Sequence, residues 1–141
     1  MPQTILTLQT SGQGLYEFTA QAAAFARVHA AETALLTVFV QHTSCSLIIQ
    51  ENADPDVQVD LRNFFARMAP PATDPSMNYL IHRMEGPDDM PAHIKAALTQ
   101  TSIGIPVNAG RLTLGTWQGI YLFEHRDAPH DRKIVLHLSA E

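Results

Sequence analysis

The stretch from Ser102 to Ile120 constrains the fold more than any other part of the chain. It begins with the strand-like run Ser102-Ile-Gly-Ile-Pro-Val, which leads into Asn108-Ala109-Gly110. These three residues tolerate positive φ, so they predict a tight turn between antiparallel strands. The second arm, Arg111-Leu-Thr-Leu-Gly-Thr-Trp-Gln-Gly-Ile120, carries the only tryptophan between two glycines. The stretch therefore predicts a β-hairpin whose second arm presents a polar and aromatic cluster.

Most of the remaining chain is also strand-like. β-Branched and apolar residues, alternating or continuous, predict strands at 4–10, 33–40, 47–49, 103–107, 112–114, 118–124 and 133–138, with 15–18 extending the first pairing. Residues 79–82 fit either a short strand or an extended segment, and 70–76 fit a flexible loop. Strands thus outnumber helices, and most connections between them are short.

Three helices are predicted from their starting residues. Thr19 is a candidate N-cap for an alanine-rich helix at 20–30, and Asp54-Pro55 starts a second helix that should end before Pro70. Asp89 is read as the cap of a short helix at 91–98. Together with the strands, these signals predict an α+β fold, an antiparallel-rich β-sandwich with two to three helices. A length of 141 residues fits a single domain over 1–141.

Charge and cysteine content narrow the functional classes. The net charge is −5 and no basic run is present, which argues against binding to nucleic acid or to an anionic membrane surface. Cys45 is the only cysteine, so an intrachain disulfide is excluded and a reducing compartment is expected. The N-terminus lacks the pattern of a secretion signal, and no apolar stretch is long enough to span a bilayer. We therefore expect a cytoplasmic protein that acts on a small molecule.

Histidine is the residue type that most directly indicates chemistry in this chain. Of seven histidines, His42, His82 and His93 each lie at the end of a predicted element, near residues that can support a ligand. Three imidazoles from separate elements, with one open position, are the arrangement of catalytic zinc. The spacing is unlike a compact H-E-x-x-H signature, so the residues alone leave structural histidines as the alternative.

Acidic residues near these histidines suggest a different metal. Oxygen ligands from Glu51, Asp54, Asp56, Asp88 or Asp89 would suit Mg²⁺ bound together with substrate phosphates. Helix capping explains Asp54 and Asp89 equally well, and Asp56 complements the helix dipole. Lys95 and Arg111 are the cations best placed to hold a phosphate, although either could be ordinary surface charge.

Two further residue types have both a chemical and a structural interpretation. Cys45 could act as a nucleophile beside His42, but it precedes an apolar run and is read as a buried thiol. Trp117 could stack on a pyrimidine or lie in the core. Thr116 and Gln118 point away from Trp117 in a regular strand. All three line one pocket only if Gly115 and Gly119 allow a bulge.

Four segments together resemble the YjbQ family, often labelled secondary thiamine-phosphate synthase. They are His42-Thr-Ser-Cys-Ser-Leu, Glu51-Asn-Ala-Asp-Pro-Asp-Val57, Glu85-Gly-Pro-Asp-Asp-Met-Pro-Ala-His-Ile-Lys95 and Leu114-Gly-Thr-Trp-Gln-Gly-Ile-Tyr-Leu122. The resemblance covers nearly the whole chain, and Glu124-His-Arg126 extends it. Two departures affect the width of the pocket: Cys45-Ser46 replaces a frequent Ala-Gly pair, and Phe123 stands where Cys is common.

The resemblance implies an α+β sandwich that assembles as a homotrimer around a pocket lined by histidines. On the matching positions, His42, His82 and His93 would bind a divalent metal, zinc or magnesium, or act in acid–base chemistry. The residues implied around them are Glu51, Asn52, Asp54, Asp88, Lys95, Thr116 and Gln118. Trp117 and Arg111 would complete the substrate site.

Three functions remain open from the sequence. The resemblance implies an enzyme that joins hydroxymethylpyrimidine diphosphate to a thiazole phosphate, with Lys95 or Arg111 beside the departing pyrophosphate. Zinc held by histidines would instead favour hydrolysis of a small phosphorylated metabolite, with Glu51 or Asp88 as proton acceptor. The third possibility is a non-catalytic trimer that binds a small anion.

Overall fold

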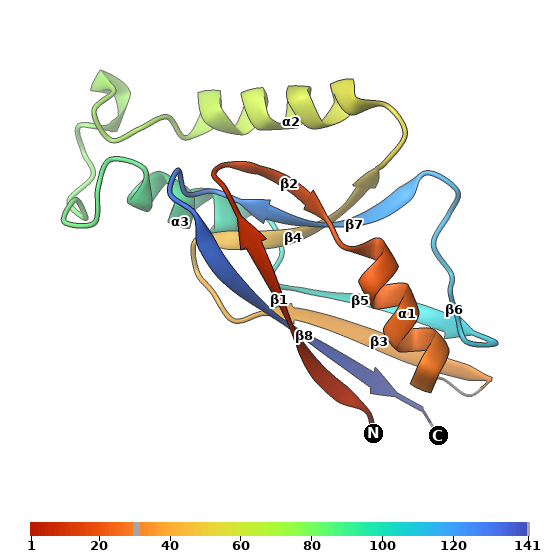
Figure 1. Ribbon diagram of the computed structural model, residues 1–141. Coiled ribbons are helices and arrows are strands. Elements are labelled where there is room, and N and C mark those ends of the chain that lie inside the picture. The colour runs from red at the N-terminus through yellow and green to blue at the C-terminus, as the bar shows by residue number, and fades with distance from the viewer. Residues whose placement is uncertain (30–31, 141) are drawn as a thin grey trace.

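The computed structural model describes residues 1–29 and 32–140 of the chain (Figure 1). Within these residues, none of the helices combines the length and the apolar composition that a membrane span requires. Its elements follow the order β1 (Gln3–Thr10), β2 (Gly14–Glu17), α1 (Thr19–His29), β3 (Thr33–Val40), β4 (Cys45–Glu51), α2 (Pro55–Met68), the short 3₁₀ helix η1 (Pro75–Met77), α3 (Asp89–Leu98), β5 (Ser102–Asn108), β6 (Arg111–Leu112), β7 (Gln118–Glu124) and β8 (His130–Ser139).

The strands form two antiparallel sheets. The larger sheet has the order β1-β8-β3-β5-β6 and the smaller one the order β2-β7-β4. β8 is an inner strand of the larger sheet, because it pairs with β1 along one edge and with β3 along the other. β2 joins the smaller sheet by pairing with β7, so the predicted extension of the first strand's pairing at 15–18 is wrong. The predicted α+β class with antiparallel sheets is confirmed.

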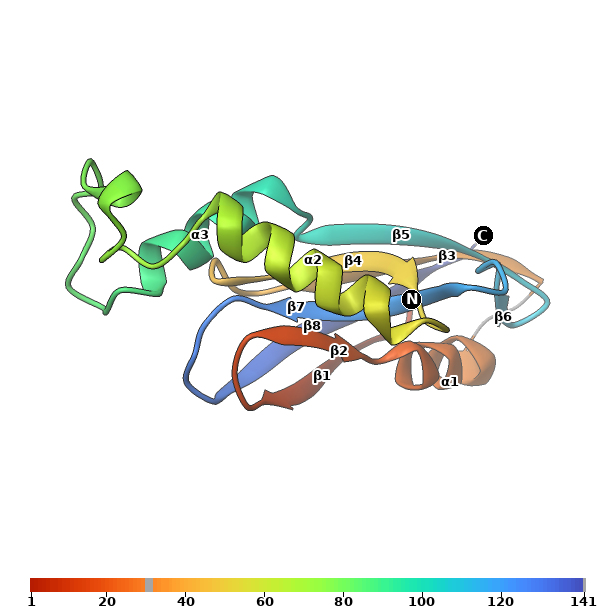
Figure 2. The ribbon, with the colours of Figure 1, turned by 90° about the horizontal axis from the view of Figure 1, so that it is seen from above.

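The main core lies between the two sheets and under α1. Alternate residues of β3 and β8, including Leu36, Val38 and Leu136, point into it together with Ile120 and Leu122 of β7. The two buried alanines of α1, Ala22 and Ala26, let this helix approach the strands closely. Figure 2 shows α1 beside the sheets, whereas α2 crosses the smaller sheet as a separate layer.

Local sequence signals explain most element boundaries. The predicted hairpin turn is confirmed, since Ala109 and Gly110 have φ of 51° and 76° and Asn108 pairs with Arg111. Asp54 is the N-cap of α2, and its side chain accepts a hydrogen bond from the Asp56 N–H. The alanine-rich helix begins one residue earlier than predicted and ends at His29, and its predicted last residue, Ala30, lies outside the described residues.

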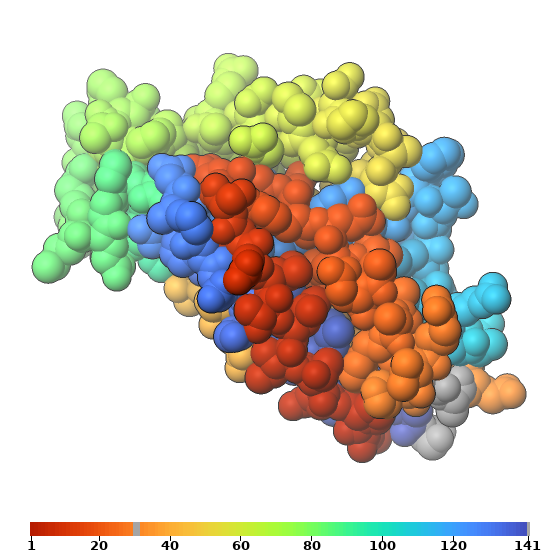
Figure 3. Space-filling model, in the orientation of Figure 1, coloured from red at the N-terminus to blue at the C-terminus, as the bar shows by residue number. Residues whose placement is uncertain are grey.

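The segment between α2 and α3 folds around a small core of its own. Ala69, Ala72, Met77 and Leu80 are buried there, and Met90 and Ile94 of α3 pack against them. Of the two alternatives for 79–82, the strand is wrong, because Tyr79 belongs to the turn after η1 and 80–82 have irregular backbone. In Figure 3 this segment and α3 form a lobe at one end of the molecule. The lobe carries the candidate site.

A buried ion pair ties the two sheets together next to this lobe. Glu124, the last residue of β7, accepts hydrogen bonds from Arg132 Nε of β8 at 2.8 Å and from Thr10 Oγ1 of β1 at 2.6 Å. Arg132 also donates to the Ser44 hydroxyl at 3.0 Å. Both carboxylate oxygens of Glu124 have partners, as a buried charge requires. The pair therefore holds the end of β7, from which the chain continues to Arg126 and the candidate site.

Candidate metal centre

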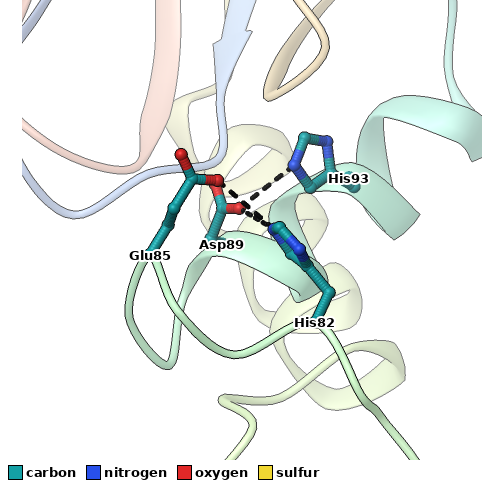
Figure 4. Close-up of side chains that lie close together, drawn as sticks. All are labelled: His82, Glu85, Asp89 and His93. Carbon is teal, nitrogen blue, oxygen red and sulfur yellow. Dashed lines mark hydrogen bonds and ion pairs between the residues drawn. The ribbon is translucent and has the colours of Figure 1, made fainter.

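Two histidines and two carboxylates converge at the start of α3. One ligand-type atom from each of His82, Glu85, Asp89 and His93 lies within 4.8 Å of all the others (Figure 4). Asp89 Oδ2 is at the centre of the group, 2.7 Å from His82 Nε2 and 3.1 Å from His93 Nε2. Glu85 Oε2 lies 3.3 Å from His82 Nε2. The side chain of Asp89 is 3% exposed and that of Glu85 is 64% exposed, so the cluster opens to solvent on the Glu85 side.

The spacing of α3 places two of these residues on one face. Asp89 and His93 are four residues apart, which brings their side chains together on a helix. Asp89 is the first residue of α3 and Asp88 occupies the N-cap position without a capping hydrogen bond from its side chain. The prediction that Asp89 caps this helix is therefore wrong. Its carboxylate faces the histidines instead of the helix backbone.

The hydrogen bonds of His93 determine which of its nitrogens carries a proton. Nδ1 lies 2.9 Å from the carbonyl oxygen of Thr43, which can only accept, so Nδ1 must donate. In a neutral ring, Nε2 then presents a lone pair to the Asp89 carboxylate, which is also an acceptor. Such an arrangement is favourable only when a cation, either a proton on Nε2 or a metal ion, lies between the two groups.

Asp89 is ionised in this environment. Burial by itself would raise the pKa of Asp89, but hydrogen bonding with His82 and Glu85 and the charges of His93 and Arg126 outweigh burial and lower it. The same contact has the reciprocal effect on His82, whose pKa is raised mainly by its hydrogen bond to Asp89. The cluster thus concentrates negative charge where two imidazole nitrogens meet.

The distances within the cluster fit a common metal ion. Around tetrahedral zinc with bonds of about 2.0–2.2 Å, neighbouring ligand atoms lie roughly 3.3 Å apart. The separations from Asp89 Oδ2 to the two imidazoles, 2.7 and 3.1 Å, are hydrogen-bond distances and are shorter than this, and that from Glu85 to His82 is 3.3 Å. Small side-chain rotations would therefore suffice to place these atoms around one ion.

Arg126 donates hydrogen bonds to Asp89 of the cluster and to two neighbouring groups. It follows β7 and donates from Nε to Asp88 Oδ2 at 2.9 Å, from Nη1 to Asp89 Oδ1 at 2.7 Å and from Nη2 to the Glu85 carbonyl at 3.0 Å. These contacts and the nearby charges of Asp88, Asp89 and Glu85 raise the pKa of Arg126. Asp88, which was predicted as a catalytic residue, is thus held by Arg126 and by the Asp127 N–H, outside the four-residue cluster.

His42, the third predicted metal ligand, does not belong to this cluster. Its Nε2 accepts a hydrogen bond from the Lys133 N–H at 2.7 Å, and burial together with the Arg132 charge lowers its pKa. It lines a shallow groove formed by 39–44 and Thr101. His42 is nevertheless linked to the cluster through its neighbour in sequence, because the carbonyl of Thr43 accepts a hydrogen bond from His93 Nδ1.

A second group of predicted residues gathers at the opposite end of the smaller sheet. Glu51 pairs with Gln118, and the Asn52 N–H donates to the Trp117 carbonyl at 2.9 Å. Glu51 also accepts from the Asp54 N–H. β7 runs six residue steps from Gln118 to Glu124, about 20 Å along a strand, and Arg126 lies beyond that far end. The expectation of one site beside Trp117 is therefore wrong for the single chain.

The Gly115–Gly119 segment forms a turn in place of the bulge considered above. The Gln118 N–H donates to the Gly115 carbonyl, and the Gly115 N–H donates to Gln118 Oε1 at 2.8 Å. Thr116 and Trp117 are exposed at this turn, and the indole retains 61% of its accessible surface. Trp117 is thus neither a core residue nor part of the histidine cluster.

The two predicted phosphate-binding cations lie apart from each other. Lys95 on α3 is 4% exposed and donates to Gln13 Oε1 at 3.1 Å, and burial lowers the pKa of its ammonium group. Arg111 follows the hairpin turn and lines a pocket with Arg27, Leu112 and Leu114 beside α1. Neither side chain belongs to the histidine cluster.

The single thiol has the structural role that the sequence favoured. Cys45 is fully buried at the start of β4, and burial raises its pKa to about 12. A thiol in this environment stays protonated, so it is a poor nucleophile. The hypothesis that Cys45 acts as a nucleophile beside His42 finds no support in this geometry.

Sequence reasoning missed Glu85 and Arg126, and it considered Asp89 only as a helix cap or a magnesium ligand, not as the partner of the two histidines. The signal available was the spacing His82-x₂-Glu85-x₃-Asp89-x₃-His93, which places four potential ligands within twelve residues. Its helical half, Asp89 and His93, is a recognisable i, i+4 pair. Arg126 had no local signal, since it reaches the cluster from the other side of the fold.

Comparisons with known proteins agree with the fold and with the residues that carry the resemblance. Residues 4–141 match the family model described as UPF0047 protein YjbQ-like. The chain is 52% identical to a UPF0047 protein of Synechocystis over 99% of this chain and 92% of that protein. It is 42% identical to UPF0047 protein YjbQ of Escherichia coli over 99% of this chain and 98% of that protein.

Solved structures give the same result. A YjbQ/UPF0047 family protein from Clostridium acetobutylicum superimposes with a TM-score of 0.84 at 33% identity, covering 96% of this chain and 98% of that one. A hypothetical protein from Aeropyrum pernix superimposes with a TM-score of 0.87 at 27% identity, with both chains fully covered. The chain therefore belongs to the YjbQ-like UPF0047 family.

Proposed function

We propose that this protein is a metal-assisted hydrolase of a small phosphorylated metabolite, with a zinc-type ion held by His82, Asp89 and His93. One observation carries the proposal. Asp89 Oδ2 lies 2.7 Å from His82 Nε2 and 3.1 Å from His93 Nε2, and Nδ1 of His93 donates to Thr43, so the contact between His93 and Asp89 needs either a second ring proton or a metal ion. A divalent cation between them would satisfy both acceptors and the nearby His82 Nε2.

The donor set favours zinc over magnesium. Two imidazoles and one carboxylate are typical of zinc, whereas magnesium takes oxygen ligands and keeps several waters. Two of the carboxylates considered for magnesium are occupied elsewhere: Asp54 caps α2, and Asp88 pairs with Arg126. When bound, zinc would act as a Lewis acid and lower the pKa of a coordinated water towards neutrality.

The chain's own residues supply positioning and proton transfer. Thr43 fixes the ring of His93, and Arg126 fixes the carboxylate of Asp89. Glu85 lies on the open side of the cluster, with its carboxylate 3.3 Å from His82 Nε2 and its side chain largely exposed. Glu85 is therefore the residue best placed to accept a proton from water that enters from solvent.

The synthase reaction implied by the resemblance is a second candidate. The exposed indole of Trp117 provides a face on which a pyrimidine could stack. It lies beside Asn52 and Gln118, at the far end of the smaller sheet from the histidines. In one chain, a pyrimidine on Trp117 would be remote from the metal centre, so this geometry favours hydrolysis over the diphosphate transfer.

Metal analysis combined with turnover separates the three functions. Protein purified without an affinity tag would be assayed for bound metals, then tested for release of phosphate from phosphorylated substrates and of pyrophosphate from the synthase substrates. About one zinc per chain with phosphate release supports the hydrolase. Magnesium-dependent release of pyrophosphate would support the synthase instead. Tight binding of a phosphorylated ligand without any turnover would indicate the non-catalytic binding protein.

We also propose that the protein acts as a homotrimer. Ile5 of β1 and Phe39 of β3 both pair with Val135 of β8, and their side chains form an exposed apolar row across the outer face of the larger sheet. A second apolar patch flanks His82, where Ile81 and Met84 are 96% and 99% exposed. Exposed apolar surface of this kind is typical of protein–protein contacts.

A further inference from the structure

The strongest further feature of the molecule is the position of Arg126. Its side chain is 18% exposed and donates to three different groups, namely the carboxylates of Asp88 and Asp89 and the carbonyl of Glu85. Each of the three guanidinium nitrogens has one of these acceptors. Arg126 therefore connects the end of β7 with the loop and the helix that carry the metal-binding residues.

The contact with Asp89 controls how that carboxylate can bind a metal. Arg126 Nη1 occupies Oδ1 at 2.7 Å, which leaves Oδ2 as the oxygen that faces both imidazoles. A carboxylate held in this way presents Oδ2, and not Oδ1, to an ion between the imidazoles. Monodentate coordination keeps the number of ligands low, as zinc in a tetrahedral site requires.

The contact with Asp88 separates two adjacent acids. Asp88 Oδ2 accepts from Arg126 Nε and from the Asp127 N–H, both at 2.9 Å. These bonds hold Asp88 outside the cluster, although it directly precedes Asp89 in the chain. Without them, a second carboxylate would be available to the ion. An additional oxygen ligand would favour harder metals such as magnesium or manganese.

We propose that Arg126 is a positioning residue that makes Asp89 a monodentate ligand, keeps Asp88 away from the ion, and thereby sets the preference of the site for zinc. This inference rests on the proposed metal centre. Lysine cannot take this role, because a single ammonium group cannot reach three acceptors that a planar guanidinium contacts in fixed directions. A positive charge at position 126 without the geometry of the guanidinium group is therefore insufficient for this role.

The test compares wild type with Arg126→Lys, using Co²⁺ as a spectroscopic probe and Zn²⁺ and Mn²⁺ in competition titrations. We expect wild type to show the intense visible absorption of four-coordinate cobalt. In Arg126→Lys, a freed Asp89 or Asp88 oxygen should raise the coordination number and weaken the absorption. Zinc affinity should fall about 10- to 100-fold, as for other residues that orient metal ligands. Manganese affinity should fall less than zinc affinity.

Arg67→Lys on the exposed side of α2 is the matched control and should behave as wild type. Circular dichroism and urea unfolding would show that Arg126→Lys is folded. If wild type binds cobalt and Arg126→Lys keeps both its affinity and its spectrum, the role of Arg126 is refuted while the metal centre stands. If wild type binds neither cobalt nor zinc, the proposed metal centre itself fails.

Discussion

Asp89 is the residue on which the proposed centre depends most. It is almost fully buried, it touches both histidines, and its second oxygen is held by Arg126. Replacing it by asparagine keeps the size of the side chain but removes the charge that a cation needs. We expect Asp89→Asn to weaken zinc binding by more than about 100-fold, beyond the loss typical of residues that only orient a ligand.

Competition titration with a chromogenic chelator would measure this change. Asp54→Asn is the matched control, because it makes the same chemical change at a helix cap where asparagine is an equally good residue. It should bind zinc as wild type does. Equal zinc affinity in Asp89→Asn and wild type would contradict the assignment of Asp89 as a ligand.

His125 provides a prediction about pH and stability. It is 1% exposed, its Nε2 lies 2.9 Å from the Ser46 hydroxyl, and Nδ1 has no partner among the described residues. Burial and the charges of Lys95 and Arg132 lower its pKa to about 3. In the unfolded chain its pKa returns to about 6.5, so the unfolded state binds a proton that the folded state refuses. His125 therefore destabilises the fold as the pH falls below 6.5.

The variant His125→Gln removes this titration and retains a side chain able to bond with Ser46. Between pH 6 and 4, the unfolding free energy of wild type should fall more steeply than that of the variant, by up to about 1.4 kcal/mol per pH unit. Urea unfolding at several pH values measures both slopes. Asp89 and Glu124 also have lowered pKa values, and they contribute equally to the pH dependence of the unfolding free energy of wild type and variant. Parallel slopes would show that His125 is not the responsible group.

Among the elements, α2 depends most on local interactions. None of its residues is fully buried, and it crosses the smaller sheet as a separate layer (Figure 1). The Asp54 side chain satisfies one free N–H at its start, and Pro55 fixes the first helical residue. We expect Asp54→Ala to lower the unfolding free energy by about 1 kcal/mol.

Urea unfolding at pH 7 tests this value, with Asp60→Ala as the control. Asp60 is an exposed residue within the same helix, where alanine is the better helix former. The control should therefore be as stable as wild type or slightly more stable. If Asp54→Ala lost no stability relative to wild type, the cap would contribute nothing to the fold.

Elements whose boundaries depend on local chemistry were predictable, whereas the site was predicted only in part: His82 and His93 were named as ligands, but their carboxylate partners were not. The turn at Ala109–Gly110 and the start of α2 follow from residues that permit few backbone conformations. At the start of α3, the adjacent acids Asp88 and Asp89 satisfy the same capping rule, so sequence cannot say which one faces the histidines. That choice is made by Arg126, 37 residues beyond Asp89, through contacts that only the folded chain creates.

Pairing between distant strands explains why the His42 and Trp117 segments, which were expected to meet, lie apart. These two segments were expected to form one site because the resemblance places both around one pocket lined by histidines. The register of β4 against β7 places Cys45 opposite Glu124 and Glu51 opposite Gln118, which sends the two segments to opposite ends. Register depends on the packing of the whole sheet, and a periodic pattern does not define which end meets which neighbour.

At the scale of the whole molecule, the outer face of the larger sheet is expected to hold three copies together. Phe39 is 44% exposed and lies in one row with Ile5 and Val135. A charge in this row would have to be buried without a partner if the face forms an interface, at a cost that few contacts can offset. We therefore expect Phe39→Glu to be a folded monomer.

Light scattering coupled to size-exclusion chromatography would measure the mass of wild type and variants. Wild type should have three times the chain mass of 15.5 kDa, and Phe39→Glu should have that mass once. Phe64→Glu on α2 is the matched control, since Phe64 is 58% exposed but lies outside the row, and it should remain trimeric. A monomeric wild type would refute the trimer. A trimeric Phe39→Glu with a monomeric Phe64→Glu would move the interface from the larger sheet to α2.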